Sequence, residues 1–113
     1  MSANEMLTLP QAPSADQLPP DMRDAVSRYR VELEGGRTLL LTLRHGRLSI
    51  EEGAGEADCV LTCPLVLFHH ALSGEVNLMT AFMRGDLAMS GDLVAAKRLY
   101  RYLRLSRTRG EHP

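Results

Sequence analysis

Two adjacent histidines, His69 and His70, are the side chains in this sequence with the widest range of chemistry. An imidazole can act as a general acid, a general base or a metal ligand near neutral pH. On a helix, however, neighbouring residues point about 100° apart, so the two rings cannot easily share one ligand or substrate. We therefore expect a structural or surface role for both histidines.

The two cysteines, Cys59 and Cys63, lie four residues apart in a stretch that we interpret as a strand. That spacing separates them by about 13 Å along the strand, beyond the limit of about 7 Å between the Cα atoms of a disulfide. We expect two free, structural thiols. With no third or fourth ligand nearby, the pair does not predict a metal site. Asp58 precedes Cys59, but strand neighbours face opposite sides, so this carboxylate does not activate the thiol.

The serines and glycines also lack the context of known catalytic motifs. Ser73-Gly74 and Ser90-Gly91 are not part of a G-x-S-x-G nucleophile elbow. Gly85 and Gly91 are six residues apart, but Asp92 follows where a phosphate-binding loop needs Lys and then Ser or Thr. The sequence therefore predicts a protein without catalytic residues, metal or cofactor.

Composition and charge narrow the class of protein further. The chain has 113 residues, 44% of them hydrophobic, with 13 Lys and Arg against 14 Asp and Glu, which predicts one domain and no nucleic-acid partner. No apolar run approaches the roughly 20 residues that span a bilayer. The first residues do not resemble a cleaved signal, so we expect a cytoplasmic location.

Alternation of apolar and polar residues predicts most of the elements. Strands are expected at residues 29–34, 37–43, 47–51, 57–63 and 86–90, and helices between Pro64 and Gly74, from Glu75 or Asn77 to Met83, and from Asp92 to about Arg104. Gly35-Gly36 forms a hairpin turn between the first two strands. The order β-β-β-β-α-α-β-α predicts an α+β fold, a five-stranded, mostly antiparallel sheet covered on one face by helices.

The two ends of the chain differ from this middle part. Residues 1–20 contain four of the six prolines among Ser, Asn, Gln and Ala, a composition that favours a flexible arm or a strap. A single helical turn is compatible with residues 21–25. We therefore divide the chain into an arm at 1–20, a domain at 21–106 and a basic tail at 107–113.

Four stretches together resemble the sterol carrier protein type-two family, in order and spacing, over about residues 26–104. They are the hairpin at 42–50, the Ala-Asp strand start at 57–62, the Leu-x-Gly helix end at 72–75, and residues 81–93, where a helix with an aromatic is followed by Gly, a short strand, Gly-Asp and a final helix. The resemblance implies helices on one side of a five-stranded sheet, with an apolar cavity between them that binds sterols, fatty acyl chains or other lipids. Many family members have a longer N-terminal helical region, where this chain has a Pro-rich arm.

Ten apolar residues are the candidate lipid-binding set under this resemblance. They are Leu61, Phe68, Leu72, Met79, Phe82, Met83, Leu87, Met89, Leu99 and Leu103. The flexible thioethers suit a surface that adapts to varied chains. On pattern alone, the same residues are more typical of an ordinary core, and only the resemblance favours a cavity.

Basic residues gather in the last predicted helix. Lys97, Arg98, Arg101 and Arg104 share one side of it, and Arg107 and Arg109 follow. The opposite side is predicted to be an apolar stripe of Leu93, Ala96, Leu99, Tyr100 and Leu103. Near an anionic membrane surface each basic charge is worth about 1 kcal/mol. We expect the basic side to make transient contact with such a surface during lipid transfer, the alternative being a solvated helix face.

Two functions remain open from the sequence. The first is a non-catalytic carrier or presenter that holds a fatty acyl, isoprenoid or sterol-like chain between sheet and helices. The second is a protein-interaction or accessory module whose apolar groove binds a partner enzyme or a second copy of itself, as a homodimer. A closed cavity around a lipid would favour the first, and a flat, shared groove the second.

Overall fold

The structure, a computed structural model, describes residues 9, 10 and 12–110 of the chain. Its elements are η1 (Ala15–Gln17), α2 (Pro20–Asp24), β1 (Val26–Leu33), β2 (Arg37–Arg44), β3 (Arg47–Glu52), β4 (Cys59–Cys63), α3 (Leu65–Ser73), α4 (Leu78–Arg84), β5 (Ala88–Gly91) and α5 (Leu93–Gly110). From β1 onward this is the predicted order β-β-β-β-α-α-β-α. The α+β fold class is confirmed.

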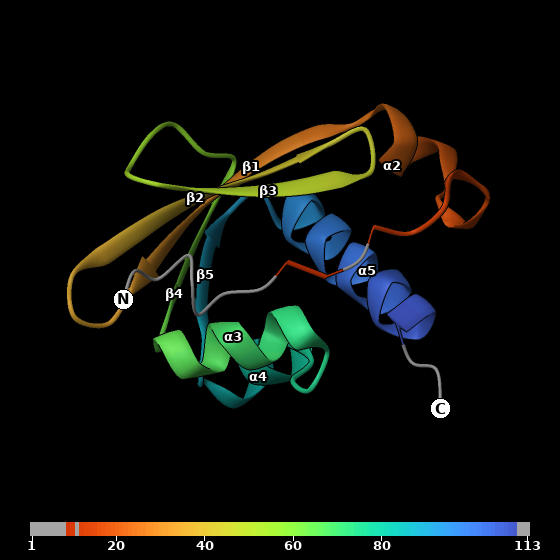
Figure 1. The fold of residues 1–113 in the computed structure, drawn as a ribbon. Coiled ribbons are helices and arrows are strands. Elements are labelled where there is room, and N and C mark those ends of the chain that lie inside the picture. The colour runs from red at the N-terminus through yellow and green to blue at the C-terminus, as the bar shows by residue number, and fades with distance from the viewer. Residues whose placement is uncertain (1–8, 11, 111–113) are drawn as a thin grey trace.

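The described strands form one five-stranded sheet in the order β3-β2-β1-β4-β5 (Figure 1). The pairs β1–β2, β2–β3 and β4–β5 are antiparallel, as predicted for most of the sheet. The central pair, β1 with β4, is parallel. A parallel pair needs a crossover connection, and here the chain crosses from β3 at one edge to β4 beyond β1.

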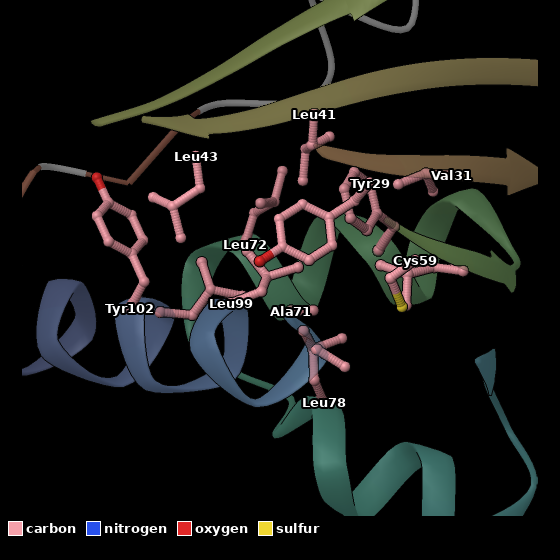
Figure 2. Close-up of a cluster of buried hydrophobic side chains, with 14 of the residues drawn as sticks. Tyr29, Val31, Leu41, Leu43, Cys59, Ala71, Leu72, Leu78, Leu99 and Tyr102 are labelled. Carbon is pink, nitrogen blue, oxygen red and sulfur yellow. The ribbon is translucent and has the colours of Figure 1, made fainter. Parts of the chain in front are cut away.

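One face of the sheet is apolar and covered by α3, α4 and α5 (Figure 1). Every second residue of β1 and β2 points to that side, beginning with Tyr29 and Leu39, and is buried. Burial of such side chains contributes about 1.5–3 kcal/mol each. Figure 2 shows Tyr29 reaching from the sheet toward the helices, while Tyr102 reaches from α5 toward the sheet. The core is the layer between them.

Helix α5 differs from its prediction in both length and orientation. It continues to Gly110, whereas the sequence pattern placed its end near Arg104. The predicted apolar stripe included Leu93 and Tyr100, but Leu93 is 54% exposed and the buried tyrosine of α5 is Tyr102. Tyr102 extends from α5 toward the sheet (Figure 2), and burial in this layer raises the pKa of its hydroxyl.

The described part of the Pro-rich segment packs against the end of the sheet. Leu18 and Met22 belong to the core, and Leu18 lies directly over Gly46 in the β2–β3 turn. Pro20 begins α2, the position where a helix tolerates proline best. The rest of the predicted arm and tail, residues 1–8, 11 and 111–113, lies outside the described residues.

Candidate functional site

A cleft of about 280 Å³ separates the α3–α4 connection from α5. It is lined by Ala71, Gly74, Glu75, Val76, Asn77, Leu78, Tyr100, Leu103 and Arg104. Ala71, Leu78 and Leu103 are buried and belong to the core. The inner wall of the cleft is therefore continuous with the apolar layer under the sheet.

The turn between α3 and α4 shapes one rim of this cleft. Gly74 ends α3 at a φ of 87°, a left-handed conformation that glycine adopts without strain. Asn77 begins α4, and its Oδ1 accepts hydrogen bonds from the amides of Met79 at 2.9 Å and Thr80 at 3.1 Å. Because both helix ends are fixed in this way, the rim is held in a defined position.

Tyr100 and Arg104 form the opposite rim, on α5. The Arg104 guanidinium donates a hydrogen bond of 3.0 Å to the Tyr100 hydroxyl and lies 5.7 Å from the centre of its ring. Asn77 donates to the same hydroxyl across the cleft, at 3.5 Å. Hydrogen bonds from Asn77 and Arg104 lower the pKa of Tyr100 below its ordinary value. An apolar wall with a polar rim suits an amphipathic ligand.

A second groove, of about 330 Å³, adjoins the first along α5. It is lined by Gln17, Pro19, Tyr100, Arg101, Arg104 and Leu105. Tyr100 and Arg104 line both grooves and so stand between them. The Arg101 guanidinium lies 3.2 Å from a carboxylate oxygen of Asp21, which ties α5 to α2 beside this groove.

The ten predicted lipid-binding residues occupy three environments. Six are buried in the core, namely Leu61, Phe68, Leu72, Leu87, Leu99 and Leu103; Met79, Phe82 and Met89 are half-buried; and Met83, at the end of α4, is 81% exposed. Of the ten, Leu103 lines the cleft. The structure therefore gathers most of the set in one apolar layer and leaves Met83 outside it.

The four predicted membrane-contact residues do not share one environment either. Arg98 points toward the sheet, where its Nη1 donates a hydrogen bond to the buried Ser27 hydroxyl on β1. Arg101 pairs with Asp21, and Arg104 with Tyr100. Lys97 is exposed. Contact with an anionic membrane stays a prediction, and Arg98 is the residue held farthest from such a role.

The structure also shows where the cysteines and histidines lie, the side chains that were considered as catalytic groups or metal ligands. Cys59 and Cys63 are free, buried thiols on the inner face, and burial raises the pKa of Cys63 to about 11. The rings of His69 and His70 are 5.4 Å apart, and His70 pairs with Glu75. In the described part of the chain, no three His, Cys, Asp or Glu residues come together as metal ligands would.

The sequence did not reveal two polar features of the helix layer. The Tyr29 hydroxyl donates a buried hydrogen bond of 2.6 Å to the carbonyl of Ala95, and burial raises its pKa to about 12. Tyr100 was assigned to the apolar stripe, although its four-residue spacing to Arg104 on a helix is a signal for a contact between the two side chains.

Three solved structures show what this fold is similar to. The "UbiJ-SCP2 Ubiquinone synthesis protein" is 18% identical with a TM-score of 0.67, covering 96% of this chain and 88% of that one. Palmitated SCP2L2 from Aedes aegypti is 16% identical, with a TM-score of 0.56 and coverages of 78% and 82%. The stereoselective inverting sec-alkylsulfatase Pisa1 from Pseudomonas sp. is 18% identical, with a TM-score of 0.58 over 93% of this chain but 14% of the enzyme.

The remaining comparisons concern the sequence itself. None of the curated proteins matches it. Among the helices of the described residues, none combines the length and the apolar composition that a transmembrane span requires. The family model of the SCP-2 sterol transfer family matches residues 4–104, nearly the whole chain. With the sterol carrier resemblance thus confirmed, the chain belongs to the SCP-2 sterol transfer family.

Proposed function

We propose that this protein reversibly binds one fatty acyl, isoprenoid or sterol-like chain, admits it through the cleft between α3–α4 and α5, and acts as a carrier or presenter. Membership of the SCP-2 sterol transfer family suggests lipid binding or transfer. The observation that carries the finer proposal is the cleft itself, because its buried walls, Ala71, Leu78 and Leu103, lead from a polar rim into the apolar layer.

The energetics of such binding need no covalent step. Each CH₂ group of a ligand contributes about 0.8 kcal/mol when it leaves water. Ligand pockets commonly measure about 300–1,000 Å³, so a cleft of about 280 Å³ holds one end of a long chain. The remainder of the ligand requires the helix layer to move apart. Met79 and Phe82, which are half-buried beside that layer, can adjust without opening the centre of the core.

Three similar structures support this choice of ligand class. One is a palmitated protein, and another is a ubiquinone synthesis protein. The third is an alkylsulfatase, of which this fold covers a small part. A domain that holds an apolar chain for a partner enzyme would fit all three proteins. The proposal therefore includes presentation of the bound chain to such an enzyme.

Transfer to an anionic membrane surface is the second part of the proposal. Lys97 is exposed, and Arg101 makes a surface pair with Asp21. Because an exposed pair of this kind is worth at most about 1 kcal/mol, Arg101 can exchange Asp21 for a lipid headgroup at little cost. Binding to phosphatidylglycerol vesicles should weaken in Lys97→Gln and as salt rises. Unchanged binding in this variant would remove Lys97 from the membrane contact.

Native mass spectrometry of the freshly purified protein, followed by organic extraction, tests the carrier directly. We expect a bound mass that corresponds to a lipid with an acyl or isoprenoid chain. A protein free of ligand that also forms a dimer would contradict the carrier and point to the interaction module.

A tryptophan at the cleft tests the location. The chain has no Trp, so Tyr100→Trp would give a single emission signal at the rim. We expect palmitate to shift this emission to shorter wavelength in a saturable way. Val66→Trp, at a position that is 62% exposed on α3, is the control that should not respond.

A side chain added to the cleft wall provides the matching loss of function. Ala71→Leu fills space between α3 and α5, and we expect at least about tenfold weaker palmitate binding, since the added bulk displaces two or more CH₂ groups of the ligand. Ala88→Leu makes the same change at an exposed position of β5 and should bind normally. Equal affinity in the two variants would place the ligand elsewhere.

A further inference from the structure

The face of the sheet opposite α3, α4 and α5 holds a separate hollow of about 710 Å³. It is lined by Arg28, Leu40, Thr42, Arg44, His45, Arg47, Ser49, Glu51 and Glu56. In Figure 1 the helices α3, α4 and α5 lie on the other side of the sheet. The hollow therefore belongs to a different surface from the cleft.

The strand register brings three arginines to one end of this hollow. Arg44 and Arg47 are directly opposite each other on β2 and β3, joined by a turn in which His45 and Gly46 both have positive φ. Arg28 on β1 is opposite Thr42, two residues before Arg44 on the same face. Thr42 is in turn opposite Ser49 on β3. Two hydroxyl groups thus stand beside three guanidinium groups.

These three guanidinium groups have no hydrogen bond or ion pair within the described residues. Other surface arginines do have acidic partners, as Arg30 has Glu32 at 3.1 Å and Arg37 has Glu52 at 3.2 Å. Like charges directly opposite each other in a sheet are destabilising. A sequence that keeps such a cluster in a concave surface departs from local rules in the way that binding sites do.

The acidic residues of the hollow lie toward its other end. Glu51 is opposite Leu40, one row beyond the Thr42–Ser49 pair. Glu56 belongs to the β3–β4 loop, which passes over Leu40 at Gly55. The loop is tied to the sheet by the amide of Asp58, which donates to the carbonyl of Arg28 at 2.8 Å. The hollow is therefore polarised, with its positive charge at the β2–β3 turn.

We propose that this hollow binds the phosphoryl group of a small soluble ligand at its arginine end. Guanidinium groups recognise phosphate oxygens in a bidentate manner, and the hydroxyls of Thr42 and Ser49 are further donors. The concave shape and the mixed charge favour a small ligand over a flat membrane surface. Since the sheet separates this hollow from the cleft, the proposal is independent of lipid binding.

Titration of the full chain with inorganic pyrophosphate, followed by amide chemical shifts, tests the site. We expect saturable shifts at Arg28, Thr42, Arg47 and Ser49. Arg44→Gln and Arg47→Gln should each weaken binding about tenfold, the loss of one charge-assisted hydrogen bond. Arg84→Gln removes the same charge from an arginine on α4 whose side chain is 73% exposed, and should bind as the parent does.

Two results would overturn the proposal. The first is an equal effect of Arg84→Gln and Arg44→Gln, because binding would then follow net charge alone. The second is an absence of pyrophosphate binding while phosphatidylglycerol vesicles bind in a manner that depends on Arg44 and Arg47. That result would assign the arginine cluster to a membrane headgroup instead.

Discussion

The two faces of the sheet are built from the same strands but have opposite chemistry. On the inner face, Tyr29 and Leu41 are fully buried against the helices. On the outer face, Arg28 and Leu40 line an open hollow. Arg28 directly precedes Tyr29, and Leu40 directly precedes Leu41. A shift of one position along the strand therefore exchanges the buried apolar layer for a charged surface.

This contrast separates stability from recognition. The inner face contributes most of the free energy of folding, and a ligand that enters it must displace side chains that already pack well. The outer face contributes little to folding, and its arginines can change partners without disturbing the core. Pairs of matched substitutions, one on each face, measure how complete this separation is.

The largest contrast is expected at two adjacent leucines of β2. Leu41→Ala removes a fully buried side chain and should lower the free energy of unfolding by about 2–5 kcal/mol. Leu40→Ala, on the outer face, should cost less than about 1.5 kcal/mol, since Leu40 is only half-buried. Urea unfolding of both variants measures the difference. Equal losses would show that the outer face also carries core packing.

The second largest effect is expected at alkaline pH, where the buried groups of the inner face lose stability. Burial raises the pKa of Tyr29 from 10.0 to about 12, so the unfolded chain loses this proton first. The contribution of Tyr29 to the free energy of unfolding is complete below pH 10. It is lost as pH rises to about 12, a change on the order of 2–3 kcal/mol. Cys63 adds a loss of the same sign from about pH 9 to 11. Unfolding free energies at pH 8 and 11 would show it.

Tyr29→Phe is the control for this pH dependence. The variant lacks the ionisable group and should show a shallower loss of stability between pH 10 and 12. A slope identical to that of the parent chain would mean that other groups cause the alkaline loss.

Two serines extend the comparison to polar side chains. Ser27→Ala removes the buried acceptor of the Arg98 guanidinium and should cost about 1–2 kcal/mol. Ser49→Ala, at an exposed position on β3, should change stability by less than about 0.5 kcal/mol. Thermal unfolding of the two variants at one pH compares them. A neutral Ser27→Ala would show that Arg98 finds another partner.

The smallest expected effect has the opposite sign. Arg44→Thr removes one of two like charges that face each other across β2 and β3, and should raise stability by about 0.2–1 kcal/mol in low salt without ligand. The gain should shrink at high salt, where the charges are screened. A loss of stability would mean that the arginine pair is already compensated within the folded protein.

Local pattern was sufficient for most of the architecture. Alternation over residues 29–34 and 37–43 identified the inner face of β1 and β2, because successive side chains of a strand point to opposite faces of the sheet. Gly74 and Gly85 marked the ends of α3 and α4, and both adopt the left-handed conformation there. The order of elements followed from these signals.

Pairing between distant segments was not available from such patterns. The parallel contact of β1 with β4 depends on how the chain crosses the sheet, which alternation within β4 does not encode. Tyr100 and Tyr102 are two residues apart on one helix, and only the packing of α5 against the sheet decides which of them is buried. The outer hollow could not be predicted from the sequence for the same reason, because its residues come from three strands and a loop.

The central parallel pair also has a consequence for the order of folding. Tyr29 of β1 is the neighbour of Cys59 in β4, thirty positions later in the chain. The meander from β1 to β3 closes through short turns and can form early, whereas β4 must close a much longer loop before its contacts form. We expect β1–β2–β3 to gain protection from hydrogen exchange first, and the helix layer only after β4 has joined the sheet.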